Sequence, residues 1–167
     1  MLDTTKILID GSLIALAFIA LLLASGLCNP RLFLNKGDLP EDILAAVPPK
    51  TARERRQSIW LGIPLIVVMV ALPFYSTYSF ALQNPGVGYW LVFAHFFLVV
   101  LIPNLVDLFL IDWLILCTIT PSFFVYAGTE GFAGYKDYGF HLRQHAKALP
   151  VLTLFIAALA WLVLAIA

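Results

Sequence analysis

Charged residues are scarce in this sequence. Only 12% of its 167 residues are Asp, Glu, Lys or Arg, whereas about a quarter of the residues in an ordinary soluble domain are charged. Acidic and basic residues balance to a formal net charge of zero, so the chain lacks the basic surface that nucleic-acid binding requires. Long blocks of like charge, which favour disordered tails, are also absent.

Cysteine and histidine are rare as well. The two cysteines, Cys28 and Cys117, fall near predicted helix ends on the side assigned below to the cytoplasm, where no disulfide is expected. Three histidines are too few for the histidine-rich two-metal centre of a membrane oxygenase. Walker A, Rossmann, H-E-x-x-H, G-x-S-x-G and C-x-x-C motifs are missing. Nucleotide hydrolysis and serine hydrolysis are therefore disfavoured, and the sequence leaves open whether the chain is an enzyme.

Long hydrophobic runs are what the sequence does contain. Hydrophobic residues make up 62% of the chain, and a helix of about 20 apolar residues crosses the ~30 Å hydrocarbon layer of a membrane. Four stretches have this length and composition, at about residues 7–28, 52–82, 88–119 and 149–167. We therefore predict an all-α, polytopic membrane protein, with one domain over residues 1–167 built as a bundle of four transmembrane helices.

Local signals place the ends of these helices. Pro30 stops the first, because the residue before a proline is pushed out of helical geometry. Thr51 and Glu54 form a capping box ahead of the second. The third stretch is too long for one crossing, so we expect it to bend at Pro103 or to project beyond the membrane. The glycines expected at close helix contacts are Gly11, Gly26 and Gly62.

Two polar loops, residues 29–58 and 120–148, connect the hydrophobic runs. Residues 38–47 of the first loop predict a short interfacial helix, whose apolar side chains share one side. These side chains are Leu39, Ile43, Leu44 and Val47. The two loops hold every lysine and arginine of the chain except Lys6. By the positive-inside rule, both large loops are predicted to be cytoplasmic and both termini to lie outside.

Three polar side chains interrupt the third hydrophobic run: Asn104, Asp107 and Asp112. Ionisable residues within a membrane helix are costly and mark a functional site by default. On an α-helix the two acids lie about 140° apart with Asn104 between them, so all three can share one broad polar side near the cytoplasmic boundary. The alternative is that the acids pair with Arg31 or Arg143 and only fix helix packing.

The second loop combines residues suited to ligand contact. Its glycines allow tight turns, and it carries the acid Glu130 and several tyrosines, among them Tyr135. Asp137, His141 and His145 follow at intervals of four residues and would share one face of a helix. Two histidines and a carboxylate at this spacing suit a single divalent metal ion. The alternative is two ordinary interfacial histidines beside a salt-bridged Asp137.

These polar groups are predicted to meet in one pocket, because both loops and the adjoining helix ends lie at the same membrane face. The predicted working groups, acting as acid, base or proton carrier, are Asp107, Asp112, Glu130 and His141. The predicted ligand-binding residues are Arg31, Asn104, Tyr135 and Arg143, of which the arginines would hold an anionic headgroup. The predicted metal ligands are Asp137, His141 and His145.

Several short strings occur together in the sequence: NPR (29–31), AAVPPKT (45–51), DW (112–113), TITP (118–121), GTEG (128–131) and YKDY (135–138). As a set they resemble a group of small uncharacterised bacterial membrane proteins with four helices. The resemblance covers most of the chain. It implies a bacterial inner (plasma) membrane location, and it implies no activity.

Three functions are compatible with these features. The first is binding or modification of a lipid-like, amphiphilic molecule in the cytoplasmic pocket, with membrane lipid as the partner. The second is an accessory or structural subunit that pairs with other membrane protein subunits. The third is a proton- or ion-coupled carrier that uses Asp107 and His95, which lies deep in the third hydrophobic run. His95 could instead hydrogen-bond a neighbouring helix.

Overall fold

The computed structural model describes residues 1–33 and 39–167, and every regular element within them is a helix. Four of these helices are long and apolar enough to cross a membrane, as the all-α prediction requires. The first is α1 (Thr4–Cys28), and the fourth is α6 (Tyr138–Ile166). The second consists of α3 (Ala52–Ile66), a π-helical turn (Val67–Ala71) and α4 (Leu72–Gln83). The third consists of α5 (Tyr89–Val106) and a π-helical segment (Asp107–Ile119).

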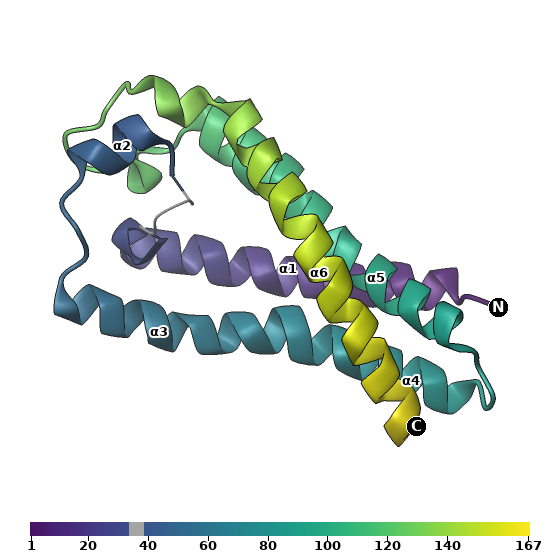
Figure 1. The fold of residues 1–167 in the computed structure, drawn as a ribbon. Coiled ribbons are helices and arrows are strands. Elements are labelled where there is room, and N and C mark those ends of the chain that lie inside the picture. Colours follow the sequence, from purple (N-terminus) through teal and green to yellow (C-terminus); the bar gives the residue numbers. More distant parts are fainter. Residues whose placement is uncertain (34–38) are drawn as a thin grey trace.

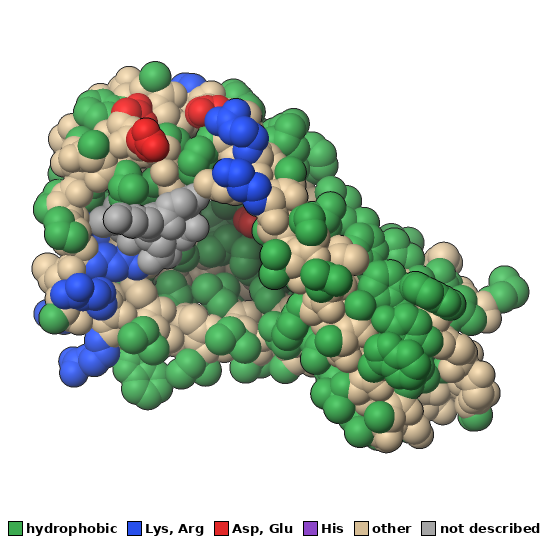
Figure 2. All heavy atoms as spheres, in the orientation of Figure 1, with side chains coloured by type: hydrophobic (Ala, Val, Ile, Leu, Met, Phe, Trp, Pro, Cys, Tyr) green, Lys and Arg blue, Asp and Glu red, His purple; other side chains and the backbone are tan. Residues whose placement is uncertain are grey.

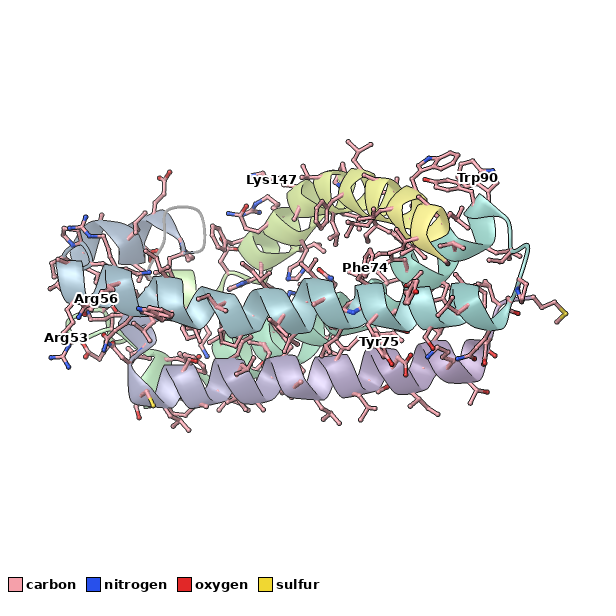
Figure 3. The ribbon with its side chains drawn as sticks, turned by 90° about the horizontal axis from the view of Figure 1, so that it is seen from below. Arg53, Arg56, Phe74, Tyr75, Trp90 and Lys147 are labelled. Carbon is pink, nitrogen blue, oxygen red and sulfur yellow. The ribbon has the colours of Figure 1, made fainter. Side chains whose placement is uncertain are left out.

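The four long helices form an elongated bundle with a polar cap at one end (Figure 1). α5 packs against α1, α4 and α6. Its buried Val99 packs with residues of α1, and its buried Val92 packs with residues of α4 and α6. The short helix α2 (Glu41–Ala46) and the second polar loop lie at one end, and both chain termini lie at the other. Figure 3 shows Arg53 and Arg56 at the capped end and Trp90 at the opposite end.

The predicted start of the second helix is confirmed. The hydroxyl of Thr51 accepts a hydrogen bond from the Glu54 backbone N–H at 3.2 Å, and the Glu54 carboxylate accepts one from the Thr51 N–H at 2.7 Å. Pro103 lies inside α5 without ending it, and the helix passes into π-helical geometry at Asp107. The third hydrophobic run therefore changes its winding rather than stopping at the proline.

The fourth helix differs from its prediction. α6 begins at Tyr138 rather than near residue 149, so much of the predicted second loop is helical. Asp137 caps this helix, because its carboxylate accepts a hydrogen bond from the Phe140 N–H at 2.7 Å. Hydropathy misses these first turns because their residues are polar, and the cap satisfies the helix end without any apolar signal.

A short helix, α2, lies within the range predicted for the interfacial helix, and its apolar side packs on the second loop. Ile43 is fully buried against Tyr126 and Tyr135. The Gly134 N–H donates a hydrogen bond of 2.9 Å to Asp42, which joins the two loops. Contact of α2 with a membrane surface stays a prediction. Residues 34–38, which include the predicted helix start at Asp38 and the basic residue Lys36, lie outside the described residues.

Two of the three glycines expected at close contacts do lie at them. A Cβ atom placed on Gly11 would come within 2.5 Å of the Ile102 Cδ1 atom and 3.0 Å of its Cβ atom, so α1 and α5 approach closely only because this side chain is absent. Gly26 likewise makes room for the Phe124 ring. Gly62 differs, because no atom of the described residues lies within 4 Å of a Cβ atom built there.

We expect Gly11→Leu to destabilise the bundle and Gly62→Leu to leave it nearly unchanged. The first substitution overpacks the interface of α1 with α5, which typically costs about 1–3 kcal/mol. The second places its side chain in open space. The measurement is the free energy of unfolding in mixed detergent and SDS micelles. Equal losses in the two variants would show that α1 and α5 do not pack as described.

Candidate functional site at the polar end of the bundle

A cavity of about 300 Å³ lies at the capped end of the bundle. It is enclosed by α1, the π-helical segment Asp107–Ile119, the first turns of α6, and the cap formed by α2 and the second loop. Figure 2 shows the surface hollowed beside this end, with hydrophobic side chains inside the hollow. Most of the lining is apolar, including Phe18, Leu22, Ile43, Ile111 and Phe140.

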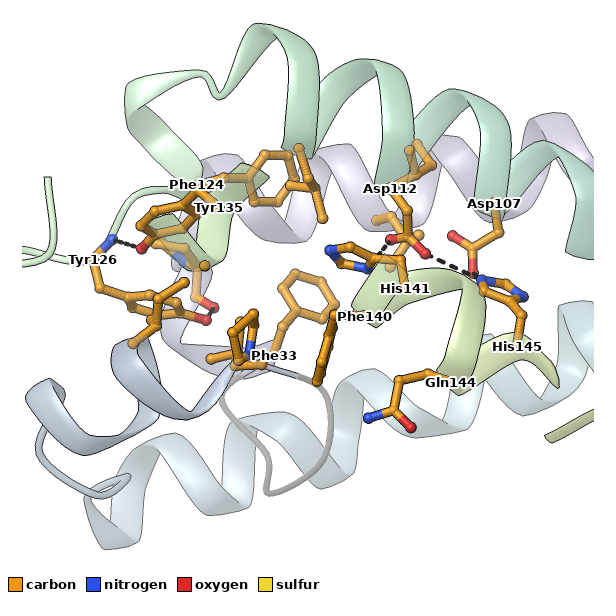
Figure 4. A pocket seen from close by; sticks show the side chains of 18 of the residues that line it. Phe33, Asp107, Asp112, Phe124, Tyr126, Tyr135, Phe140, His141, Gln144 and His145 are labelled. Atoms are coloured by element: carbon orange, nitrogen blue, oxygen red, sulfur yellow. Dashed lines mark hydrogen bonds and ion pairs between the residues drawn. The ribbon is translucent and has the colours of Figure 1, made fainter. Parts of the chain in front are cut away.

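One side of the cavity is polar and carries two acids and two histidines (Figure 4). Asp112 lies between the histidines: its Oδ1 is 3.2 Å from His141 Nδ1 and its Oδ2 is 3.1 Å from His145 Nε2. Asp107 reaches the same His145 nitrogen at 3.8 Å. All four side chains are between 12% and 27% exposed, so these charges interact in surroundings that are largely screened from water.

Two backbone features bring these groups together. In a π-helix the hydrogen bonds run from residue i to residue i+5, so Asp107 and Asp112 lie nearly one above the other instead of about 140° apart as on an α-helix. On α6, His141 and His145 are separated by four residues and share one face. This face exists only because α6 begins at Tyr138. Both features place ionisable side chains on the inner surfaces of two facing helices.

The group that could hold a metal ion differs from the predicted one. Among the described residues, ligand atoms of Asp107, Asp112 and His145 lie within 4.8 Å of one another. The predicted ligand Asp137 is not part of this group. It caps α6 and pairs with Arg143 at 3.3 Å. His141 faces the site, but in the structure it contacts Asp112. Of the three ligands predicted from the spacing, only His145 belongs to this group, and its two acids come from another helix.

The remaining predicted residues are divided between the cavity and other places. Tyr135 lines the cavity, and its hydroxyl accepts a hydrogen bond of 2.9 Å from the Tyr126 N–H. Glu130 is exposed on the second loop, where it accepts a hydrogen bond from the Gly128 N–H. Arg143 is 63% exposed and held by Asp137. Neither Glu130 nor Arg143 is among the residues that line the cavity.

Arg31 and Asn104 also lie outside the cavity lining. The Arg31 guanidinium is 2.6 Å from the Glu54 carboxylate and donates a hydrogen bond to the Pro48 carbonyl oxygen. It therefore links the two ends of the first loop. Asn104 donates a hydrogen bond of 2.9 Å to the Val100 carbonyl oxygen of its own helix. The predicted pairing of Arg31 or Arg143 with the two acids is therefore replaced by pairing with histidines.

His95 belongs to a different polar group in the other half of the bundle. Its ring is buried and stacked on Phe80 with centroids 4.4 Å apart. Its Nε2 lies 3.2 Å from the Ser76 hydroxyl, which donates a hydrogen bond of 2.5 Å to Asp10. Asp10 in turn pairs with Lys6 at 2.7 Å. His95 thus bonds to a neighbouring helix, which is the simpler of the two roles considered for it.

Sequence reasoning missed the apolar part of the site. Phe18 and Leu22 on α1, Phe124 after the π-helical segment and Phe140 on α6 all line the cavity. They carry no signal in the sequence, because such residues fill every helix of this chain. Gln144, which also lines the cavity, follows His141 by three residues on α6 and could have been found from that helical spacing.

We expect Asp112→Ala to loosen the first turns of α6. The substitution removes the carboxylate that contacts both histidines, and a hydrogen bond to a charged group contributes about 1.5–3 kcal/mol. Amide hydrogen exchange over residues 138–147 should therefore accelerate about tenfold or more. The matched control, Glu130→Ala, removes an exposed acid and should leave these rates unchanged. Unaltered exchange in Asp112→Ala would show that Asp112 does not hold α6.

No family model matches the chain, and neither a curated protein nor a solved structure matches it. The residues of the cavity and their arrangement are therefore what indicates a function.

Proposed function

We propose that this chain is a multi-pass protein of a bacterial inner membrane that binds a lipid-like, amphiphilic molecule in the cavity. The polar headgroup would lie at the polar side of the cavity against His141 and His145, and the hydrocarbon chain would lie along the apolar lining. The observation that carries the proposal is the division of one cavity into a polar side and an apolar remainder. A cavity of this composition matches an amphiphile better than a fully polar or fully apolar ligand.

The apolar lining supports the binding of one hydrocarbon chain. Small-molecule sites typically have volumes of about 300–1,000 Å³ and mostly hydrophobic walls, and this cavity of about 300 Å³ falls at the lower limit. Each buried methylene group contributes about 0.8 kcal/mol. A single chain in contact with Leu22, Ile111 and Phe140 would therefore supply much of the binding free energy, while the polar side would fix the orientation.

The charge around the cavity supports an anionic headgroup. Arg143 and Lys147 are exposed on α6, beside the turns that carry the two histidines. Figure 2 shows Lys and Arg side chains close to the hollow. Cations at this place would attract a phosphate or carboxylate group from the membrane interface. Arg143 would thus attract the headgroup toward the cavity, whereas Arg31 would have a structural role.

The positive-inside rule supports a cytoplasmic position for the capped end. Among the described residues, the basic side chains of both loops lie at or near the capped end, and Tyr89, Trp90 and Trp161 form an aromatic cluster near the other end. Aromatic side chains of this kind are typical of membrane interfaces. The cavity would then open near the headgroups of the cytoplasmic leaflet, with both termini on the outer side.

A second candidate function, that of a subunit in a larger membrane complex, is favoured by α3. This helix has no buried residue, and its side chains Ile59, Trp60 and Ile63 are exposed. Either lipid or another membrane protein would cover them. The carrier hypothesis receives less support, because Val99, Val100 and Pro103 are buried between His95 and Asp107 on α5.

We expect Leu22→Trp to weaken amphiphile binding at least tenfold, because the indole would fill space that the hydrocarbon chain needs. The control, Leu16→Trp, lies on the same helix at a side chain that is 63% exposed. Suitable probes are dodecyl phosphate, dodecanoic acid and dodecanol, bound to protein in nanodiscs and measured by native mass spectrometry. The two anionic probes should bind more tightly than dodecanol. Absence of binding to the wild-type protein, or equal loss in both variants, would contradict the proposal.

The orientation can be tested with the cysteines already present. Cys28 is exposed at the capped end, whereas Cys117 is buried. In intact spheroplasts, a membrane-impermeant maleimide should leave Cys28 unmodified and should react with it only after the membrane is opened. A Gln83→Cys substitution in a Cys28→Ser background should react in intact spheroplasts. The opposite pattern would mean that the capped end and the cavity face outward.

A further inference from the structure

The polar side of the cavity brings together three metal-binding side chains from two facing helices. Ligand atoms of Asp107, Asp112 and His145 lie within 4.8 Å of one another. Within the described part of the chain, the ion-pair partners of these two acids are His141 and His145, and no lysine or arginine neutralises them. Two carboxylates held close together in a partly dry site favour a bound cation.

We propose that Asp107, Asp112 and His145 bind one divalent first-row transition-metal ion. Oxygen and nitrogen ligands lie about 2.0–2.2 Å from such an ion, so two of them in tetrahedral arrangement lie about 3.4 Å apart. The distances from His145 Nε2 to Asp112 Oδ2 and to Asp107 Oδ2, 3.1 Å and 3.8 Å, lie on either side of that value. Two of the three pairs of ligand atoms thus have nearly the spacing that one ion requires, and the third pair lies within 4.8 Å.

His141 would act as a positioning residue for this ion. Its Nδ1 contacts Asp112 Oδ1 at 3.2 Å, which is the oxygen that does not face His145. A hydrogen bond to the outer oxygen of a ligating carboxylate fixes its orientation and commonly affects metal affinity about 10- to 100-fold. The geometry therefore gives the two histidines of α6 different roles, one as a ligand and one as its support.

The mixture of ligands indicates which ions would bind. Imidazole suits zinc, iron and related transition metals, whereas magnesium and calcium prefer sites made of oxygen alone. Three protein ligands leave a coordination position for another molecule, and all three ligands line the cavity. An anionic headgroup oxygen would take that position. This role of the ion rests on the proposed function, although the existence of the metal site does not.

The direct test measures metal bound to purified, chelator-treated protein that is then supplied with Zn²⁺, Mn²⁺ or Mg²⁺ and desalted. Mass spectrometry of the elements should find one Zn²⁺ or Mn²⁺ per chain and no retained Mg²⁺. Asp112→Asn and His145→Ala should weaken binding at least 100-fold, and His141→Ala by about 10- to 100-fold. Co²⁺ should give a visible absorption band that shifts when dodecyl phosphate is added.

Controls separate a metal site from general charge and from misfolding. Glu130→Gln changes an exposed acid that does not line the cavity, so it should bind metal as the wild type does. Should Asp112→Asn not give a monodisperse, helical protein, Asp107→Asn replaces it, because the Asp107 carboxylate is the more distant from His145. A wild-type chain that retains no metal, or an equal loss in Glu130→Gln, would overturn the inference.

The outcome can be told apart from that of the proposed function. Leu22→Trp should keep its metal while losing the amphiphile, because Leu22 belongs to the apolar lining. Metal binding without any amphiphile binding would leave the metal site standing and remove the proposed function. If the wild type retained no metal but bound the amphiphile, the proposed function would stand and the metal site would be removed.

Discussion

The contact of Asp112 with two histidines is the interaction on which the capped end depends. A carboxylate within a mostly apolar bundle is costly unless partners satisfy it, and His141 and His145 contact both of its oxygens. The same contact attaches the first turns of α6 to the π-helical segment. Those turns form one wall of the cavity, so the contacts of one half-buried carboxylate also fix the shape of the site.

The two polar loops contribute by covering each other. α2 buries Ile43 against Tyr126 and Tyr135, and Asp42 accepts a hydrogen bond from Gly134. The Tyr126 hydroxyl also donates to the Pro30 carbonyl oxygen at 3.2 Å, which joins the second loop to the end of α1. These hydrogen bonds join segments that are far apart in sequence into the cap over the cavity. Without the cap, the cavity would be an open groove between helices.

Two of the polar groups in the described part of the bundle lie well apart along its length. Lys6, Asp10, Ser76 and His95 form a chain of polar contacts near the termini, and the Asp and His residues of the cavity lie at the capped end. Buried apolar residues of α5, such as Val99 and Val100, separate them. Within the described part of the chain, the two polar groups are therefore not joined by a continuous polar path through the bundle.

The sequence by itself determined the helical class, the four long hydrophobic helices and the capping box at Thr51, because apolar length and capping are local properties of the chain. It also identified Asp107 and Asp112 as ionisable groups within an apolar run, and His141 and His145 by their four-residue spacing. Only the tertiary structure decided their grouping. The acids of the π-helical segment meet the histidines of α6 through contacts between two segments that lie far apart in the sequence. The apolar lining was equally hidden, since a leucine or phenylalanine facing a cavity has the same hydropathy as one facing lipid.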